Sequence, residues 1–77
     1  MNKARRKKIE EISEKISVLR DMIEEVKEEE SEAYENLPEG LQSSEKGEQM
    51  EEYIDTLEEA FDSLDDIVDQ LSSIAEG

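Results

Sequence analysis

The chain lacks cysteine, histidine and tryptophan, and its 77 residues include only one proline and three glycines. Without cysteine, neither a disulfide nor a thiolate metal site can stabilise the fold. Without histidine, acid–base catalysis near neutral pH would need a strongly perturbed carboxylate. Gly-rich phosphate loops, calcium-binding loops and nucleophile motifs are also absent. We therefore expect a protein that is not an enzyme and needs no cofactor or metal.

Long apolar runs are missing as well. No stretch approaches the ~18 apolar residues that a membrane-spanning helix needs. The start of the chain is rich in lysine and arginine, as in a secretory signal, but the amphipathic segment Ile9–Ile12 follows it in place of an apolar one. We therefore expect a cytoplasmic protein that does not contact membranes.

Charge is what the chain has in excess. Charged residues make up 43% of the sequence, and 24 acids against nine bases give a formal net charge of −15. Highly charged chains with few aromatic residues are often disordered. The periodicity of the apolar residues therefore decides whether this chain folds.

Apolar residues recur at heptad spacing in two segments. In the first segment, the a and d positions of the heptad hold Ile9, Ile12, Ile16, Leu19, Ile23, Val26 and Ala33. In the second segment, they hold Met50, Ile54, Leu57, Phe61, Leu64, Val68, Leu71 and Ala75. Steps of three and four residues predict two amphipathic helices, over about residues 3–35 and 44–75. Glu30 occupies the one a position that interrupts the first stripe.

Residues 36–43 predict a turn between the two helices. Pro38 lacks an amide hydrogen and disfavours α geometry at Leu37, while Gly40 permits a positive φ. Ser43 or Ser44 can cap the second helix. We expect one all-α domain over residues 1–77, an antiparallel two-helix hairpin with coiled-coil-like packing.

Folding the chain at this turn predicts which residues face each other. Every a and d layer is then apolar, except where Glu30 lies opposite Ile54. The pairs on the e flank are Lys27 with Glu58, Arg20 with Asp65, Tyr34 with Glu51, and Ser13 with Ser72. Two basic residues of an acidic chain thus meet two acids, which fixes the pairing of the flanks.

The opposite g flank is half apolar, and a single hairpin would leave its apolar row exposed. We expect an oligomer interface there, formed by Met22, Tyr53, Ala60, Ile67 and Ile74. Exposed apolar rows mark interfaces, and two such hairpins pack readily into a four-helix bundle. A groove for a helix of another protein is the alternative.

Seven acidic residues follow one another along the second helix, opposite its apolar stripe. We call this row the acidic stripe: Glu48, Glu52, Asp55, Glu59, Asp62, Asp66 and Asp69. Such a row can imitate the phosphate backbone of DNA and bind the basic groove of another protein, without binding DNA directly. It can also act only as a solvated face that keeps a small bundle soluble.

The most distinctive sequence surrounds the turn, where residues 36–50 read Asn-Leu-Pro-Glu-Gly-Leu-Gln-Ser-Ser-Glu-Lys-Gly-Glu-Gln-Met. It resembles short acidic helical proteins encoded by phages and prophages of Gram-positive bacteria. Those share an N-L-P-E-x-L-Q-x-S-E-x-G-E-x-M turn, a basic start and Leu-Glu-Glu-Ala-like heptads. The resemblance implies an accessory protein of a mobile element, which binds and inhibits or modulates a host protein.

Two other functions are compatible with the sequence. The apolar flank favours a structural or assembly factor that joins other helical components. The basic start favours a sponge for a small anionic ligand, held by Lys3, Arg5, Arg6, Lys7 and Lys8. The weaker of the two is the sponge, because in the hairpin these bases would lie near Glu76 and the C-terminus of the second helix, where positive charge is favourable. Without interleaved aromatic residues they also offer no stacking platform for single-stranded nucleic acid.

Overall fold

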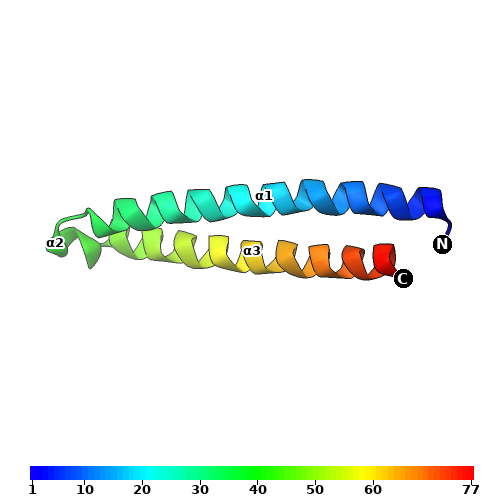
Figure 1. The fold of residues 1–77 in the computed structure, drawn as a ribbon. Helices are drawn as coiled ribbons and strands as arrows, with labels where there is room; N and C mark the ends of the chain where they lie inside the picture. Colours follow the sequence, from blue (N-terminus) through cyan, green and yellow to red (C-terminus); the bar gives the residue numbers. More distant parts are fainter.

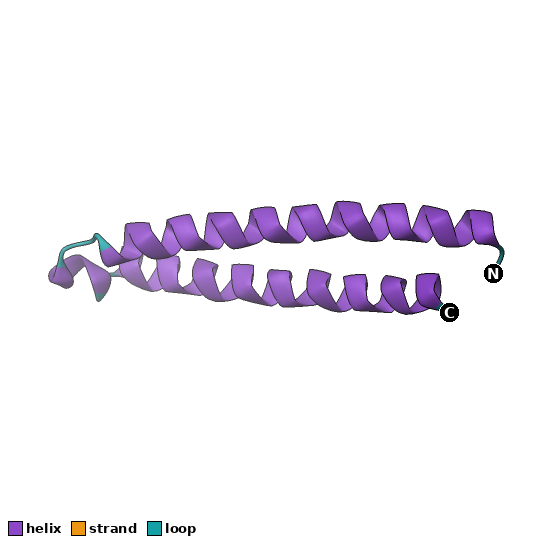
Figure 2. Ribbon diagram, in the orientation of Figure 1, coloured by secondary structure: helices purple, strands orange, loops and turns teal.

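The computed structural model describes residues 1–77 and consists of helices joined by short connections. Helix α1 spans Lys3–Glu35, the single turn α2 spans Glu39–Gln42, and α3 spans Glu45–Glu76. α1 and α3 lie side by side and antiparallel, with α2 at one end and both termini at the other (Figure 1). The molecule is a rod of 58 × 14 × 12 Å. The predicted all-α hairpin is confirmed, and loop structure is confined to the turn and the chain ends (Figure 2).

Both long helices begin with a side-chain cap. The Asn2 side chain accepts a hydrogen bond from the amide of Arg5 at 2.9 Å. The Ser44 hydroxyl accepts one from the amide of Gly47 at 3.4 Å. These bonds satisfy amide groups that have no partner within their own helix. Of the two serines predicted as caps, Ser44 is the one that caps α3.

The turn is held by a side chain that the sequence pattern did not single out. Gln42 Nε2 donates to the carbonyl oxygens of Tyr34, Glu35 and Leu37, at 3.2, 3.4 and 3.3 Å. Carbonyl groups in the last turn of a helix lack intrahelical partners, so one amide group here satisfies several of them. Gln42 thus fastens the end of α1 to the connection that follows it.

The glycine that the turn requires is Gly47, and the role predicted for Gly40 is wrong. No glycine has a positive φ, and a Cβ added at Gly40 would meet nothing within 4 Å. A Cβ at Gly47 would lie 2.1 Å from the carbonyl oxygen of Gln42. The backbone at the end of α2 therefore approaches α3 too closely for any side chain at Gly47.

The single hairpin has no fully buried apolar side chain; Ser13 and Gly47 are the only buried residues. In α3 the a and d residues are half-buried against α1, as predicted. In α1, however, the a and e residues face α3, whereas Ile12, Leu19 and Val26 at d positions are 46, 53 and 51% exposed. α1 is thus turned toward its e side, where Ser13 is buried.

Candidate functional site

One long edge of the hairpin is closed by polar contacts, and we call it the closed flank. Its contacts are Arg20 Nη1 to Asp65 Oδ1 at 2.8 Å, Lys27 Nζ to Glu58 Oε1 at 3.9 Å, and a hydrogen bond donated by the Tyr34 hydroxyl to Glu51. All three pairs were predicted from the heptad register. They confirm that the fold of the chain at the turn brings the e positions of the two helices together.

Two side chains of the closed flank have shifted pKa values. Hydrogen bonds from Arg20 to Asp21, and then to Asp65, raise the pKa of the guanidinium, which lies 5.6 Å from the centre of the Phe61 ring. The hydrogen bond to Glu51 raises the pKa of the Tyr34 phenol, with added contributions from burial and the negative charge. Both groups therefore act as polar links between the helices.

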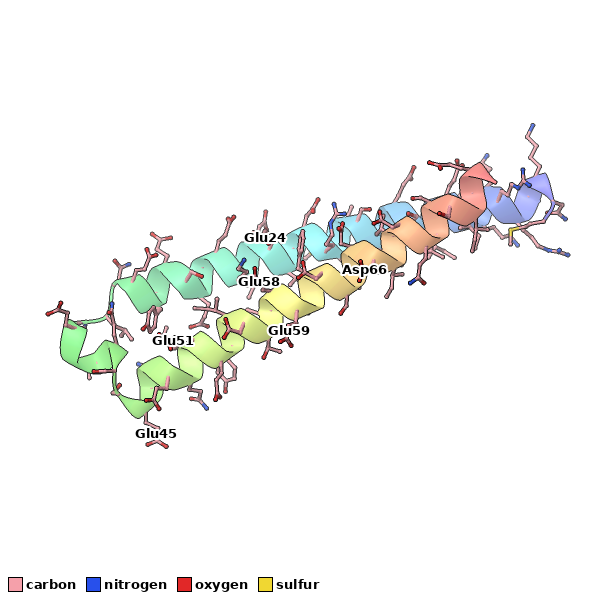
Figure 3. All side chains as sticks on the ribbon, turned by 90° about the horizontal axis from the view of Figure 1, so that it is seen from below. Glu24, Glu45, Glu51, Glu58, Glu59 and Asp66 are labelled. Carbon is pink, nitrogen blue, oxygen red and sulfur yellow. The ribbon has the colours of Figure 1, made fainter.

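The acidic stripe lies on the side of α3 that faces away from α1. All seven of its residues are exposed, and none takes part in an ion pair within the chain. Figure 3 shows acidic side chains projecting along the length of both helices, with Glu45, Glu59 and Asp66 labelled on α3. Neighbouring stripe residues are separated by one helical turn, roughly 5 Å. No cluster of these carboxylates is arranged to hold a metal ion.

The acidic residues of α3 are confined to one side of the helix. Every Asp and Glu in α3 lies at a b, e or f position of the heptad. The c positions, which border the g flank, hold exposed but uncharged side chains: Gln49, Thr56, Ser63 and Gln70. α3 therefore presents a strongly negative side and a neutral side.

The neutral side continues into an apolar surface that spans both helices. We call it the open face: Ile12, Leu19, Met22, Val26, Tyr53, Ile67 and Ile74, which are 39 to 54% exposed. At its centre is a groove of about 410 Å³ lined entirely by apolar residues: Leu19, Met22, Ile23, Val26, Leu57 and Leu64. The structure places four of the five predicted interface residues on this face and half-buries the fifth, Ala60, between the two helices.

The open face is wider than the sequence indicated. Ile12, Leu19 and Val26 were assigned to the core because they occupy d positions. The turning of α1 toward its e side moves them to the surface beside Met22. The serine at position 13, which is buried in the structure, is a sequence feature compatible with this rotation.

The basic residues at the start of the chain lie at the free end of the rod. Lys3, Arg5, Lys7 and Lys8 are exposed, and Arg6 is half-buried. None of them forms an ion pair within the chain. These five bases lie within about two turns at the start of α1, and an anionic ligand at this end stays a prediction.

No protein-family model, curated protein or solved structure matches this chain. No helix of the structure is long and apolar enough to pass through a membrane. The acidic stripe and the open face are the two extended surfaces on which a binding function can act.

Proposed function

We propose that this protein works by binding a macromolecule, with the acidic stripe of α3 meeting a basic surface on another protein. The observation that supports this is the exposure of the stripe and its lack of ion pairs. Its seven carboxylates are exposed and unpaired, and they project from one continuous helix of 32 residues. A rigid array loses little conformational entropy on docking, so its charges are already placed for a partner.

The electric field of the stripe supports fast and selective association. Single-sign charge on one face steers partners of opposite charge and raises the rate of encounter. Lys46 is the only base in α3, so little within the helix neutralises this field. Exposed charges are screened over about 8 Å at physiological salt, so affinity is expected to fall as salt rises.

The resemblance of the turn to phage and prophage proteins indicates the kind of partner. A mobile element gains from inhibiting host proteins that bind nucleic acid, and such proteins carry basic grooves. We therefore propose a small accessory protein that occupies such a groove as a DNA mimic, in the cytoplasm of the host cell.

The test is a charge-neutralised stripe. Glu52→Gln, Glu59→Gln and Asp66→Asn remove three charges from exposed side chains and are expected to leave the fold unchanged. Proteins captured from host lysate at low and high salt are identified, purified and titrated with both forms. The triple variant is expected to bind more weakly, mainly through a slower on-rate, and duplex DNA should compete for the same site.

A matched control separates the stripe from net charge. Glu14→Gln, Glu28→Gln and Glu35→Gln remove the same charge from exposed positions on α1. Only the variant of the stripe should lose affinity. Equal losses in both variants would reduce the stripe to a general charge effect, and no loss in either would leave it as a solubilising surface.

The open face supports a second candidate function, that of a structural or assembly factor. Its groove is lined only by apolar residues, and half-exposed apolar side chains extend it along both helices. Grooves of this kind accept the apolar side of an amphipathic helix. Binding there would depend weakly on salt, which distinguishes it from binding through the acidic stripe.

A further inference from the structure

The open face is too apolar for the single hairpin to leave uncovered. The hairpin buries no apolar side chain completely, and the open face holds most of the large apolar side chains that stay exposed. Fully burying one such side chain removes roughly 60–120 Å² from water. Seven half-exposed side chains on each of two chains would each bury about half of that, on the order of 400–800 Å² of apolar area in total. Because about 40% of a typical interface is polar, the whole contact approaches the lower end of the size of stable protein interfaces.

Two charges beside Met22 complement each other across a two-fold axis. Lys15 and Glu29 occupy the same heptad position as Met22, one heptad before it and one after it. Each is therefore about 10 Å from Met22 along the helix. Turning a second α1 antiparallel about Met22 places each Lys15 opposite Glu29 of the second copy. A parallel arrangement would place like charges together, which is unfavourable.

α3 fits the same symmetry axis. The contacts of Arg20 with Asp65 and of Lys27 with Glu58 fix a register in which Met22 lies within one helical turn of Ala60 along the rod. An axis near this level turns α3 antiparallel onto a second α3 and brings Tyr53 close to Ile67 of the second copy. The g and c positions there carry no charge apart from Lys46, near the end of the rod. The acidic stripes stay outside this contact.

We propose that the open face binds a second copy of this chain, in an antiparallel two-fold dimer centred on Met22 and Ala60. The product is a four-helix bundle in which each helix neighbours its own copy. Such an interface is isologous, because the same patch serves both subunits and the contact closes on itself. The proposal concerns a different surface from the acidic stripe and does not depend on it.

The decisive test exchanges the two charges. Lys15→Glu alone sets acid against acid twice per dimer, and Glu29→Lys alone sets base against base twice. Each single variant is expected to dimerise about tenfold more weakly than the unmodified protein, because two ion pairs become two repulsions. Analytical ultracentrifugation over a range of concentrations measures this, with circular dichroism to confirm that the hairpin is folded.

Mixing the two single variants tests the geometry itself. In a mixed dimer every Lys15→Glu chain meets lysines and every Glu29→Lys chain meets acids, so the mixture should regain full affinity. The double variant Lys15→Glu with Glu29→Lys should also dimerise normally. Lys7→Glu, which makes the same charge change at an exposed position away from the open face, should have no effect.

A second variant keeps the test independent of charge. Met22→Lys places two lysines on the symmetry axis and should give a folded monomer. An unmodified protein that stays monomeric at high concentration would overturn the proposal and leave the open face to a different protein. Single variants that weaken the dimer without recovery on mixing would overturn the antiparallel register.

Discussion

The closed flank and the open face run along the same two helices but are built from different interactions. On the closed flank, Arg20, Lys27 and Tyr34 reach acidic partners on α3. On the open face, Leu19 and Met22 remain about half exposed beside an apolar groove. Exposed polar pairs contribute little free energy but are directional, whereas apolar burial drives folding and association. The hairpin thus separates the side that fixes its register from the side that can add stability.

The closed flank and the open face both depend on the turn, so the largest loss of stability is expected from a substitution at Gly47. Gly47→Ala places a Cβ 2.1 Å from the carbonyl oxygen of Gln42, and backbone atoms must move to relieve the clash. We expect a loss of at least about 2 kcal/mol in the free energy of unfolding. Urea denaturation followed by circular dichroism measures it.

Gly40→Ala is the matched control for the turn. Gly40 lies in α2 with open space around it and no positive φ. Alanine there should stabilise the protein by about 0.4–1 kcal/mol, because it restricts the unfolded chain. Similar losses at both glycines would mean that backbone freedom, and not close approach at Gly47, determines the turn.

The second largest loss of stability is expected in the apolar groove of the open face. Leu64 is half-buried in α3 and lines the groove, so Leu64→Ala should lower the free energy of unfolding by about 1–2 kcal/mol. Ser63→Ala, at the neighbouring exposed position on the neutral side of α3, should change it by less than about 0.5 kcal/mol. Equal values from thermal unfolding would contradict an energetic role for the groove.

A smaller effect is expected on the closed flank. A double-mutant cycle on Lys27 and Glu58 should give a coupling of about 0.2–1 kcal/mol, because the pair is partly exposed and 3.9 Å apart. The coupling should shrink with added salt. Exchanging the charges, as Lys27→Glu with Glu58→Lys, should restore the stability that either reversal alone removes. Zero coupling at low salt would show that the pair only marks the register.

The smallest effect is a pH dependence. The raised pKa of Tyr34 means that the hairpin holds the phenol protonated at a pH where the unfolded chain, with a pKa near 10, begins to ionise. This stabilisation is complete below about pH 10 and is lost as the pH rises through the raised value. Tyr34→Phe should flatten the alkaline loss of stability. Tyr53→Phe is the control, because the Tyr53 hydroxyl makes no hydrogen bond in the hairpin.

The architecture and the closed flank could be predicted, because the sequence contains both the helical period of the apolar residues and the register that pairs the two helices. Steps of three and four residues fix the helices, and Pro38 fixes where the chain reverses. Matching the apolar layers of the two helices across the turn is then enough to pair Arg20 with Asp65. The rotation of α1 did not follow, because seams through the a and d or the a and e positions share the same period. The two seams differ in which side chains of α1 meet α3, and the period alone does not distinguish them.

The details of the turn were also beyond the pattern. Gln42 is an ordinary helix-forming residue, and its three carbonyl contacts depend on the path of the chain around α2. Gly47 did leave a signal, since a glycine within a helix destabilises it by about 1 kcal/mol relative to alanine. Pro38, Gln42, Ser44 and Gly47 all belong to the motif behind the phage resemblance. The structure gives that motif an architectural role in building the turn.

Close packing at the turn gives the hairpin a direction in which it opens. Forming the contacts beside the turn closes the shortest loop and so loses the least chain entropy. Each further heptad then adds to an existing pair, as in a zipper, which favours rapid folding at low contact order. Opening runs the other way, from the end that holds both termini. Amide hydrogens near Ile9 and Leu71 should therefore exchange with solvent before those near Ala33 and Met50.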